Sequence, residues 1–266
     1  MAEATPFHEP GRVPKPPWPT RGHPSSFDKR HPGKQACREL LVLANGYQSS
    51  RGFAPHPEVT PYSLVDELFA ARIADCYEDL QHAPHDSDVA RSYAAFKIQI
   101  LSQWLHLHAS GWVVEPWLKG GQPYADSAEM VADARGGHLF IFRGGDFPEG
   151  HLMKAPSGVH CDGLELSFND LFRGVHDIFG HALYGNGFGP RGEDLAWRVH
   201  AAMFCPRALP SMSAETRGQN SWINFGRHVR GRDVPARNRP YACQKNALLP
   251  SEFLDTSHLT PSEFHI

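Results

Sequence analysis

Two long segments with a helical pattern of apolar residues constrain the fold most strongly. Residues 60–83 and 88–110 each carry apolar side chains at helical spacing. The first helix is predicted to begin at Thr60 or Ser63, and Gly111 is predicted to end the second. Long helices joined by only a few residues favour a mainly helical domain over a doubly wound sheet.

Shorter elements complete the predicted fold, which is α+β, mainly helical with a few short strands. Further helices are expected at residues 34–47, 126–137, 167–185, 193–204 and 213–229, and short strands at residues 112–117 and 138–145. The first of these helices is expected to stop at Asn45-Gly46. Ser167 and Asp170 have the spacing of a capping box at the start of the helix at 167–185.

The two ends of the chain differ from its middle. Residues 1–34 are dense in proline and have no apolar periodicity, so we expect an extended arm. Residues 35–266 are predicted to form one domain whose last part, after residue 229, is rich in loops. A histidine in a proline-rich stretch, such as His56, is expected to lie in a loop.

Composition argues against several classes of partner. The formal net charge of −3 over 266 residues does not favour nucleic acid or an acidic membrane surface. No apolar run approaches the roughly 20 residues of a membrane span, and the N-terminal residues lack the apolar core of a signal peptide. The five cysteines are widely spaced without a Cys-x-x-Cys pair. We therefore expect no disulfide framework and a cytoplasmic location, and a homo-oligomer is compatible with the sequence.

The segment Gly-Val-His-Asp-Ile-Phe-Gly-His, residues 174–181, is the main candidate for chemistry. It lies within an apolar predicted helix, and buried imidazoles need polar partners. On an α-helix, His176 and His181 would point about 140° apart, so they can converge only on a site between their directions. Gly180 costs about 1 kcal/mol relative to alanine inside a helix. Its presence predicts a close approach of another element or a ligand beside His181.

The run Val-His-Asp-Ile-Phe-Gly-His-Ala-Leu-Tyr, residues 175–184, resembles the iron-binding helix of the pterin-dependent aromatic amino acid hydroxylases. Residues 109–117 are similar to a Thr-Gly-Trp strand that precedes this helix in the family. The resemblance implies the catalytic fold of these hydroxylases and iron ligation by His176 and His181. It also implies a glutamate as the third ligand, for which Glu215 is the nearest counterpart.

Two neutral imidazoles and one carboxylate on one face of a metal suit non-haem iron(II). The predicted set is His176, His181 and Glu215, with Glu193 as the alternative carboxylate. The domain is then expected to be an iron(II) monooxygenase that hydroxylates a small aromatic or amino-acid-like substrate with O2. Electrons would come from a tetrahydropterin or from the substrate itself. Zinc accepts the same ligands, so a zinc-dependent hydrolase is an alternative, and a non-catalytic domain with structural histidines is another.

Two charged residues near these ligands have candidate roles. Asp177 is predicted to orient a ligand histidine or to touch a cofactor, and the alternative is a solvated helix acid. Arg217 is predicted to bind a substrate carboxylate through two parallel hydrogen bonds. Its alternative role is a structural ion pair with Asp194 or Glu193.

Uncharged polar and aromatic residues extend the predicted substrate site. Gln219 and Asn220 are candidates to hydrogen-bond the substrate, and Trp222 is a candidate to stack on an aromatic ring, although helical spacing also fits a core position. His200 is either an alternate metal ligand or a core histidine. Residues 157–163 are expected to form a loop that could reach the site.

Overall fold

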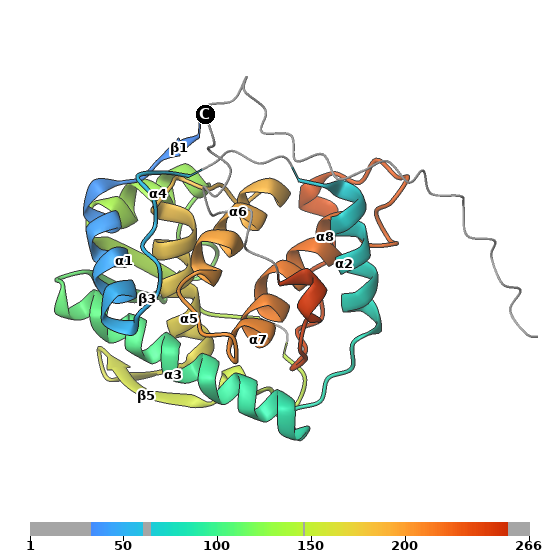
Figure 1. The fold of residues 1–266 in the computed structure, drawn as a ribbon, viewed down its shortest axis with the longest axis horizontal. Coiled ribbons are helices and arrows are strands. Elements are labelled where there is room, and N and C mark those ends of the chain that lie inside the picture. Colours follow the sequence, from blue (N-terminus) through green and yellow to red (C-terminus); the bar gives the residue numbers. More distant parts are fainter. Residues whose placement is uncertain (1–32, 61–64, 146, 255–266) are drawn as a thin grey trace, which may run out of the picture.

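The computed structural model describes residues 33–60, 65–145 and 147–254 (Figure 1). The arm predicted for residues 1–34 therefore lies outside the described residues except at its last two positions. The described helices are α1 Arg38–Arg51, α2 Glu67–Asp79, α3 Ser87–Ala109, α4 Ser127–Arg135, α5 Phe168–His176, α6 Pro190–Ala201, α7 Leu209–Ser213 and α8 Gln219–Phe225. The strands β1 Lys34–Gln35 and β2 Val59–Thr60 pair antiparallel, β3 Val113–Trp117 and β4 His138–Phe142 pair parallel, and β5 Pro156–Cys161 and β6 Leu164–Ser167 pair antiparallel.

The longest helix, α3, confirms the prediction at 88–110. Asp86 caps its N-terminus by accepting hydrogen bonds from the backbone N–H groups of residues 88 and 89. The helix packs against α5 and α7. Its buried face consists of Tyr93, Phe96, Ile100, Trp104 and Leu107. Tyr93 and the buried Gln103 also bring polar groups into the interior, and both take part in the site described below.

Helix α1 begins and ends later than predicted. Lys34 and Gln35 form β1 rather than the start of a helix, and α1 continues through Asn45-Gly46 to Arg51. Asn45 does not end the helix because its amide makes tertiary hydrogen bonds with the backbone N–H and C=O of His56. Gly52 ends the helix instead, at a φ of 72° that favours glycine.

Helix α2 is shorter than the predicted 60–83. Thr60 belongs to β2, Ser63 lies outside the described residues, and the N-cap is Asp66, whose carboxylate accepts from the backbone N–H of Phe69. The helix packs on α8. Its Ile73 lies in a small apolar cluster with Leu249 and Phe253 from the loop-rich C-terminal part of the chain.

Residues 157–163 belong to strand β5 and the turn of a β-hairpin, so the loop predicted there is wrong. Strands β5 and β6 are joined at Asp162 and Gly163, whose φ angles are 50° and 77°. Two consecutive positive φ angles at an Asp-Gly pair are typical of a tight hairpin turn. The Asp-Gly signal was therefore present in the sequence. The hairpin ends at Ser167, directly before α5.

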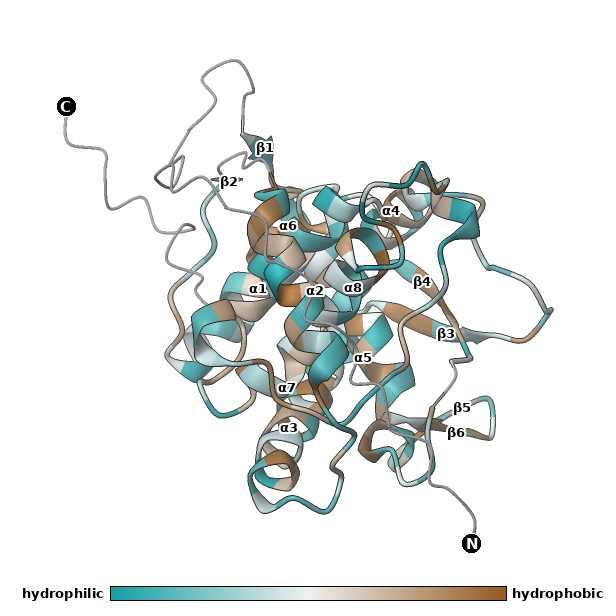
Figure 2. Cartoon of the chain, turned by 90° about the vertical axis from the view of Figure 1, so that its right-hand side faces the viewer, coloured by the Kyte–Doolittle hydropathy of each residue, from teal (hydrophilic) through white to brown (hydrophobic). Residues whose placement is uncertain are grey.

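The short strands β3 and β4 confirm the strands predicted at 112–117 and 138–145, and α4 lies between them in the chain. Helix α5 packs on β4, and Gly174 permits a close approach, because an added Cβ would lie 2.9 Å from the Trp104 ring and 3.1 Å from Val114. Most helices carry both hydrophilic and hydrophobic stretches, as expected when one face is buried (Figure 2).

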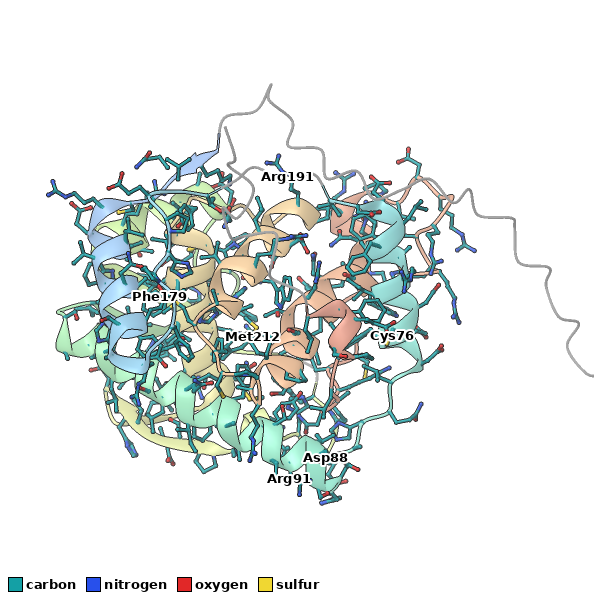
Figure 3. The ribbon with its side chains drawn as sticks, in the orientation of Figure 1. Cys76, Asp88, Arg91, Phe179, Arg191 and Met212 are labelled. Atoms are coloured by element: carbon teal, nitrogen blue, oxygen red, sulfur yellow. The ribbon has the colours of Figure 1, made fainter. Side chains whose placement is uncertain are left out.

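The later helices follow the prediction with changes at their ends. Helix α6 starts at Pro190, and the helix predicted at 213–229 is α7, a π-helical segment Ala214–Gly218 and α8. Figure 3 shows Phe179 and Met212 in the interior, whereas Asp88 and Arg91 form an ion pair at the outer end of α3. No helix in the described ranges combines the length and apolar character needed to cross a membrane.

Candidate metal centre

The predicted capping box fixes the start of the helix that carries the histidines. The Ser167 hydroxyl accepts from the backbone N–H of Asp170 at 3.2 Å, and the Asp170 carboxylate accepts from the backbone N–H of Ser167 at 2.9 Å. This reciprocal pair satisfies two backbone donors at the first turn of α5. This cap fixes where α5 begins, and His176 then lies in the last turn of α5.

A π-helical segment, Asp177–Ala182, continues directly from α5. Its backbone hydrogen bonds join residues five apart, as between the N–H of Leu183 and the carbonyl of Ile178 at 3.1 Å. Because His176 and His181 are also five apart, a π turn brings them closer to one face than the 140° separation expected for an α-helix. The two rings lie 5.1 Å apart and are almost perpendicular. Such segments occur frequently at functional sites.

Glu193 supplies a third donor next to the two histidines. A glycine-rich turn, residues 185–189, leads from the π-helical segment into α6, which carries Glu193 in its first turn. One ligand atom from each of His176, His181 and Glu193 lies within 4.8 Å of the other two. The Nε2 atom of His181 is 3.5 Å from a carboxylate oxygen of Glu193. We refer to these three residues as the His–His–Glu cluster.

Hydrogen bonds determine which nitrogen of His176 is free. The Nε2 atom of His200 lies 2.7 Å from the Oε1 of Gln103, which can only accept, so His200 carries its proton on Nε2. The Nδ1 of neutral His200 must then accept, and it lies 3.0 Å from the Nδ1 of His176. His176 therefore donates from Nδ1, and its Nε2 keeps the lone pair that a metal needs.

His181 has the same tautomer for a different reason. Its Nδ1 donates to the backbone carbonyl of Asn186 at 3.0 Å, so in the neutral ring the lone pair is on Nε2, next to Glu193. Asn186 is held by a hydrogen bond from its amide to the carbonyl of Gly180 and by one that it accepts from the ammonium of Lys34. The first strand of the described chain thus supports a candidate ligand histidine.

Burial and neighbouring charges set the protonation of the site. Burial lowers the pKa of His176 and of His200, and therefore keeps both imidazoles neutral. For His181, burial acts to lower the pKa, but Glu193 and Asp177 outweigh it and leave the pKa raised. Burial raises the pKa of Asp177 to about 6, against the opposing effect of His181.

Glu215, the first choice for the third ligand from the sequence, lies in a different hydrogen-bond network. One carboxylate oxygen accepts from the Tyr93 hydroxyl at 2.5 Å and lies 3.3 Å from the Nε2 of His151. The other oxygen accepts from the amide of Gln219 at 3.0 Å. The structure groups the two histidines with the alternative carboxylate, Glu193, because α6 returns alongside the π-helical segment.

Three other predicted site residues contribute to helix packing. Arg217 is buried, 3.2 Å from a carboxylate oxygen of Asp194, with its guanidinium 3.9 Å from the centre of the Trp197 ring. This is the structural ion pair named as its alternative role. Asn220 donates to the carbonyl of Pro190. Trp222 hydrogen-bonds Glu78 of α2 and packs on the ring of His228.

Asp177, the residue after His176, lines two cavities, and only the first of them is also lined by a member of the His–His–Glu cluster, His176. The first, of about 130 Å³, is here called the polar cavity. It is lined by Asn169, Phe172, Arg173, His176, Asp177, Glu215, Gln219 and Gln244. The second, of about 80 Å³, is here called the aromatic cleft. It is lined by Gln122, Pro123, Tyr124, Met130, Phe140, Phe142, Asp177 and Phe188.

The aromatic cleft was not predicted, although its residues lie in recognisable elements. Phe140 and Phe142 alternate along β4 with the buried Leu139 and Ile141, so they point to the opposite face of the strand. Phe188 follows the glycine-rich turn and is 47% exposed, and its ring lies 5.3 Å from that of His181. An exposed phenylalanine in a turn could have drawn attention to a ligand surface.

Comparison with other proteins adds no relative. No protein-family model, no curated protein and no solved structure gives a significant match to this chain. The similarity of residues 175–184 to the aromatic amino acid hydroxylases therefore stays a prediction from that motif.

Proposed function

We propose that the His–His–Glu cluster binds iron(II) and that the protein is a non-haem iron oxygenase acting on a small aromatic or amino-acid-like molecule. The observation that carries the proposal is the convergence of three donors within 4.8 Å of one another. The Nδ1 proton of each imidazole in the cluster is held by a second residue, so the neutral form of each ring offers Nε2 to a metal. Histidines that bind metals almost always donate the N–H of their other ring nitrogen to a neighbouring acceptor in this way.

The donor set fits the metal. Two imidazoles and one carboxylate suit non-haem iron(II), which would supply the activation of O2 when bound. The same donors accept zinc, and a zinc hydrolase would use a carboxylate as general base. The aromatic cleft beside His181 favours the oxygenase, because a hydrolase needs no apolar surface next to the metal.

The residues around the cluster have distinct roles in this proposal. Tyr124, Phe142 and Phe188 would contact a planar ring, and the Phe188–His181 contact would bring that ring beside the metal. Asp177 adjoins both cavities, so it would hydrogen-bond a polar group of the bound molecule. The second electron pair would come from a tetrahydropterin or from the substrate itself.

Metal analysis of untagged protein tests the proposal. Wild type is expected to contain nearly one iron per chain, His176→Ala to lose it, and Glu193→Gln to retain much less. Glu215→Gln is the matched control, since it neutralises a carboxylate that lies in another network, and it is expected to keep its iron. Iron lost from Glu215→Gln and kept in Glu193→Gln would contradict this ligand set.

Two further outcomes decide the metal and the chemistry. Zinc that persists through iron-supplemented growth would favour the hydrolase, and no metal even after anaerobic reconstitution would overturn the metal centre. If iron binds, O2 consumption and hydroxylated products are measured with aromatic amino acids, with and without a reduced pterin. The expected result is substrate-dependent O2 consumption that His176→Ala abolishes.

A further inference from the structure

The polar cavity shares His176 and Asp177 with the metal centre but differs from the aromatic cleft in chemistry. Its wall carries two carboxylates, Asp177 and Glu215, and one guanidinium, Arg173. These side chains give formal charges of −1, −1 and +1, a sum of −1. The guanidinium is partly engaged elsewhere, because it donates to the carbonyl of Phe142 and lies over that residue's ring.

Glu215 is held in a single orientation inside this cavity. Its carboxylate, only 4% exposed, accepts from Tyr93 of α3 and from Gln219 of α8. The Nε2 of His151 lies 3.3 Å from this carboxylate and equally 3.3 Å from the amide nitrogen of Asn246. The cavity therefore contains a carboxylate that is held in place and is not a member of the His–His–Glu cluster.

Two hydrogen-bond acceptors in the lining of the same cavity have no partner among the described residues. The amide oxygen of Gln244 is fully buried and has no hydrogen-bond partner among the described residues. No described side chain hydrogen-bonds the Asp177 carboxylate, and the Gln219 amide nitrogen already donates to Glu215. A buried acceptor without a donor is costly. A ligand that supplies N–H groups would remove that cost.

We infer that the polar cavity is a ligand site for a neutral or cationic molecule bearing N–H donors, such as an amine or amidine, and that Glu215 is its specificity-determining residue. The inference rests on the proposed metal centre, because ligands in this cavity would lie beside His176. Glu215 accepts N–H groups and repels anions, so a small carboxylic acid is disfavoured as a co-substrate.

The test uses Co(II)-loaded full-length protein, whose visible absorption reports ligands that bind at the metal. Azide probes anions and imidazole probes neutral N–H-bearing ligands. Glu215→Gln is expected to bind azide about tenfold more tightly than wild type, since a nearby negative charge is removed. Its affinity for imidazole is expected to fall by more than about threefold, because the anionic acceptor of the ligand N–H is lost, whereas its affinity for Co(II) is expected to stay within about threefold of wild type. Glu58→Gln, a change at an exposed carboxylate outside the lining of the cavity, is expected to change neither azide nor imidazole affinity.

Each other outcome overturns the inference in a distinguishable way. Equal azide affinity in wild type and Glu215→Gln, or the same gain in Glu58→Gln, would show that Glu215 does not control the charge of the site. Loss of Co(II) binding in folded Glu215→Gln would make Glu215 a metal ligand. If wild type binds no Co(II), the proposed metal centre fails, and this inference fails with it.

Discussion

The Nδ1 atoms of His176 and His200 lie 3.0 Å apart in the interior, and this contact places the proton of His176 on Nδ1. His176 donates a hydrogen bond to His200, and His200 donates one to the side-chain oxygen of Gln103. The amide nitrogen of Gln103 donates in turn to the backbone carbonyl of Met203. Three side chains from α5, α6 and α3 thus prepare one metal-facing lone pair.

Replacing His200 with leucine tests this preparation. The Nδ1–H of His176 would lose its acceptor, and the ring could change tautomer or rotate, so metal affinity is expected to fall about 10- to 100-fold. The fall in affinity is measured with Co(II) by competition with a chelator. His85→Leu, a change of the same type at an exposed histidine, serves as the control. Equal affinities for His200→Leu and wild type would show that the chain of hydrogen bonds has no role in metal binding.

Lys34 is expected to support the metal centre from the first strand of the described chain. Its ammonium donates to the carbonyl of Gly185 at 2.8 Å and to the side chain of Asn186 at 3.0 Å, and Asn186 accepts the Nδ1 proton of His181. Lys34→Met should weaken Co(II) binding by about tenfold, the smaller of the effects expected when a residue that supports a ligand histidine is lost. The exposed Lys119→Met is the comparison variant. The idea fails if both variants bind Co(II) equally well.

Gly180 confirms the close approach that its place in a helix predicted. An added Cβ would lie 3.0 Å from the backbone carbonyl of Ala196 in α6 and 3.1 Å from the ring of His176. Alanine would gain about 1 kcal/mol in helix propensity, but displacing α6 costs about 1–3 kcal/mol. Gly180→Ala is therefore expected to lower both the free energy of unfolding and the Co(II) affinity.

Chemical denaturation and Co(II) titration of Gly180→Ala measure the two effects. Gly189→Ala is the control, because Gly189 has no atom within 4 Å of an added Cβ and a φ of −76°. A Gly180→Ala protein that is as stable as wild type and binds metal equally well would mean that α6 can shift without cost.

The sequence predicted the helix that carries the site better than it predicted the site itself. The capping box at Ser167 and the burial of His176 and His181 follow from local patterns, which depend on neighbouring residues along the chain. The π turn does not follow from them, because an α-helical period was assumed throughout. This assumption produced the expected 140° separation.

The choice between Glu193 and Glu215 could not be made from spacing. Both carboxylates lie on helical segments that follow His181, and only the path of the chain decides which one returns to the histidines. The glycine-rich turn at 185–189 reverses the chain directly after the π-helical segment, so α6 brings Glu193 next to the histidines. The carboxylate of Glu215 instead accepts a hydrogen bond from Tyr93 of α3. Contacts between distant segments of this kind have no local sequence signal.

His56 is predicted to make stability depend on pH. His56 lies in a loop, as the sequence predicted, but it is only 8% exposed, and burial lowers its pKa to about 4 from the ordinary 6.5. Between these values the unfolded chain binds a proton that folded His56 does not, so the free energy of unfolding falls as the pH is lowered. The contribution of this residue to that fall is about 2 kcal/mol at pH 5.

Denaturation of wild type and His56→Leu at pH 7.5 and pH 5 isolates this contribution. The variant is expected to lose about 2 kcal/mol less than wild type between the two pH values, because the other buried histidines titrate in both proteins and cancel. His85→Leu should lose as much as wild type, since His85 is exposed. An identical pH dependence for His56→Leu and wild type would mean that the folded protein accommodates a charged His56, through water or a rearranged loop.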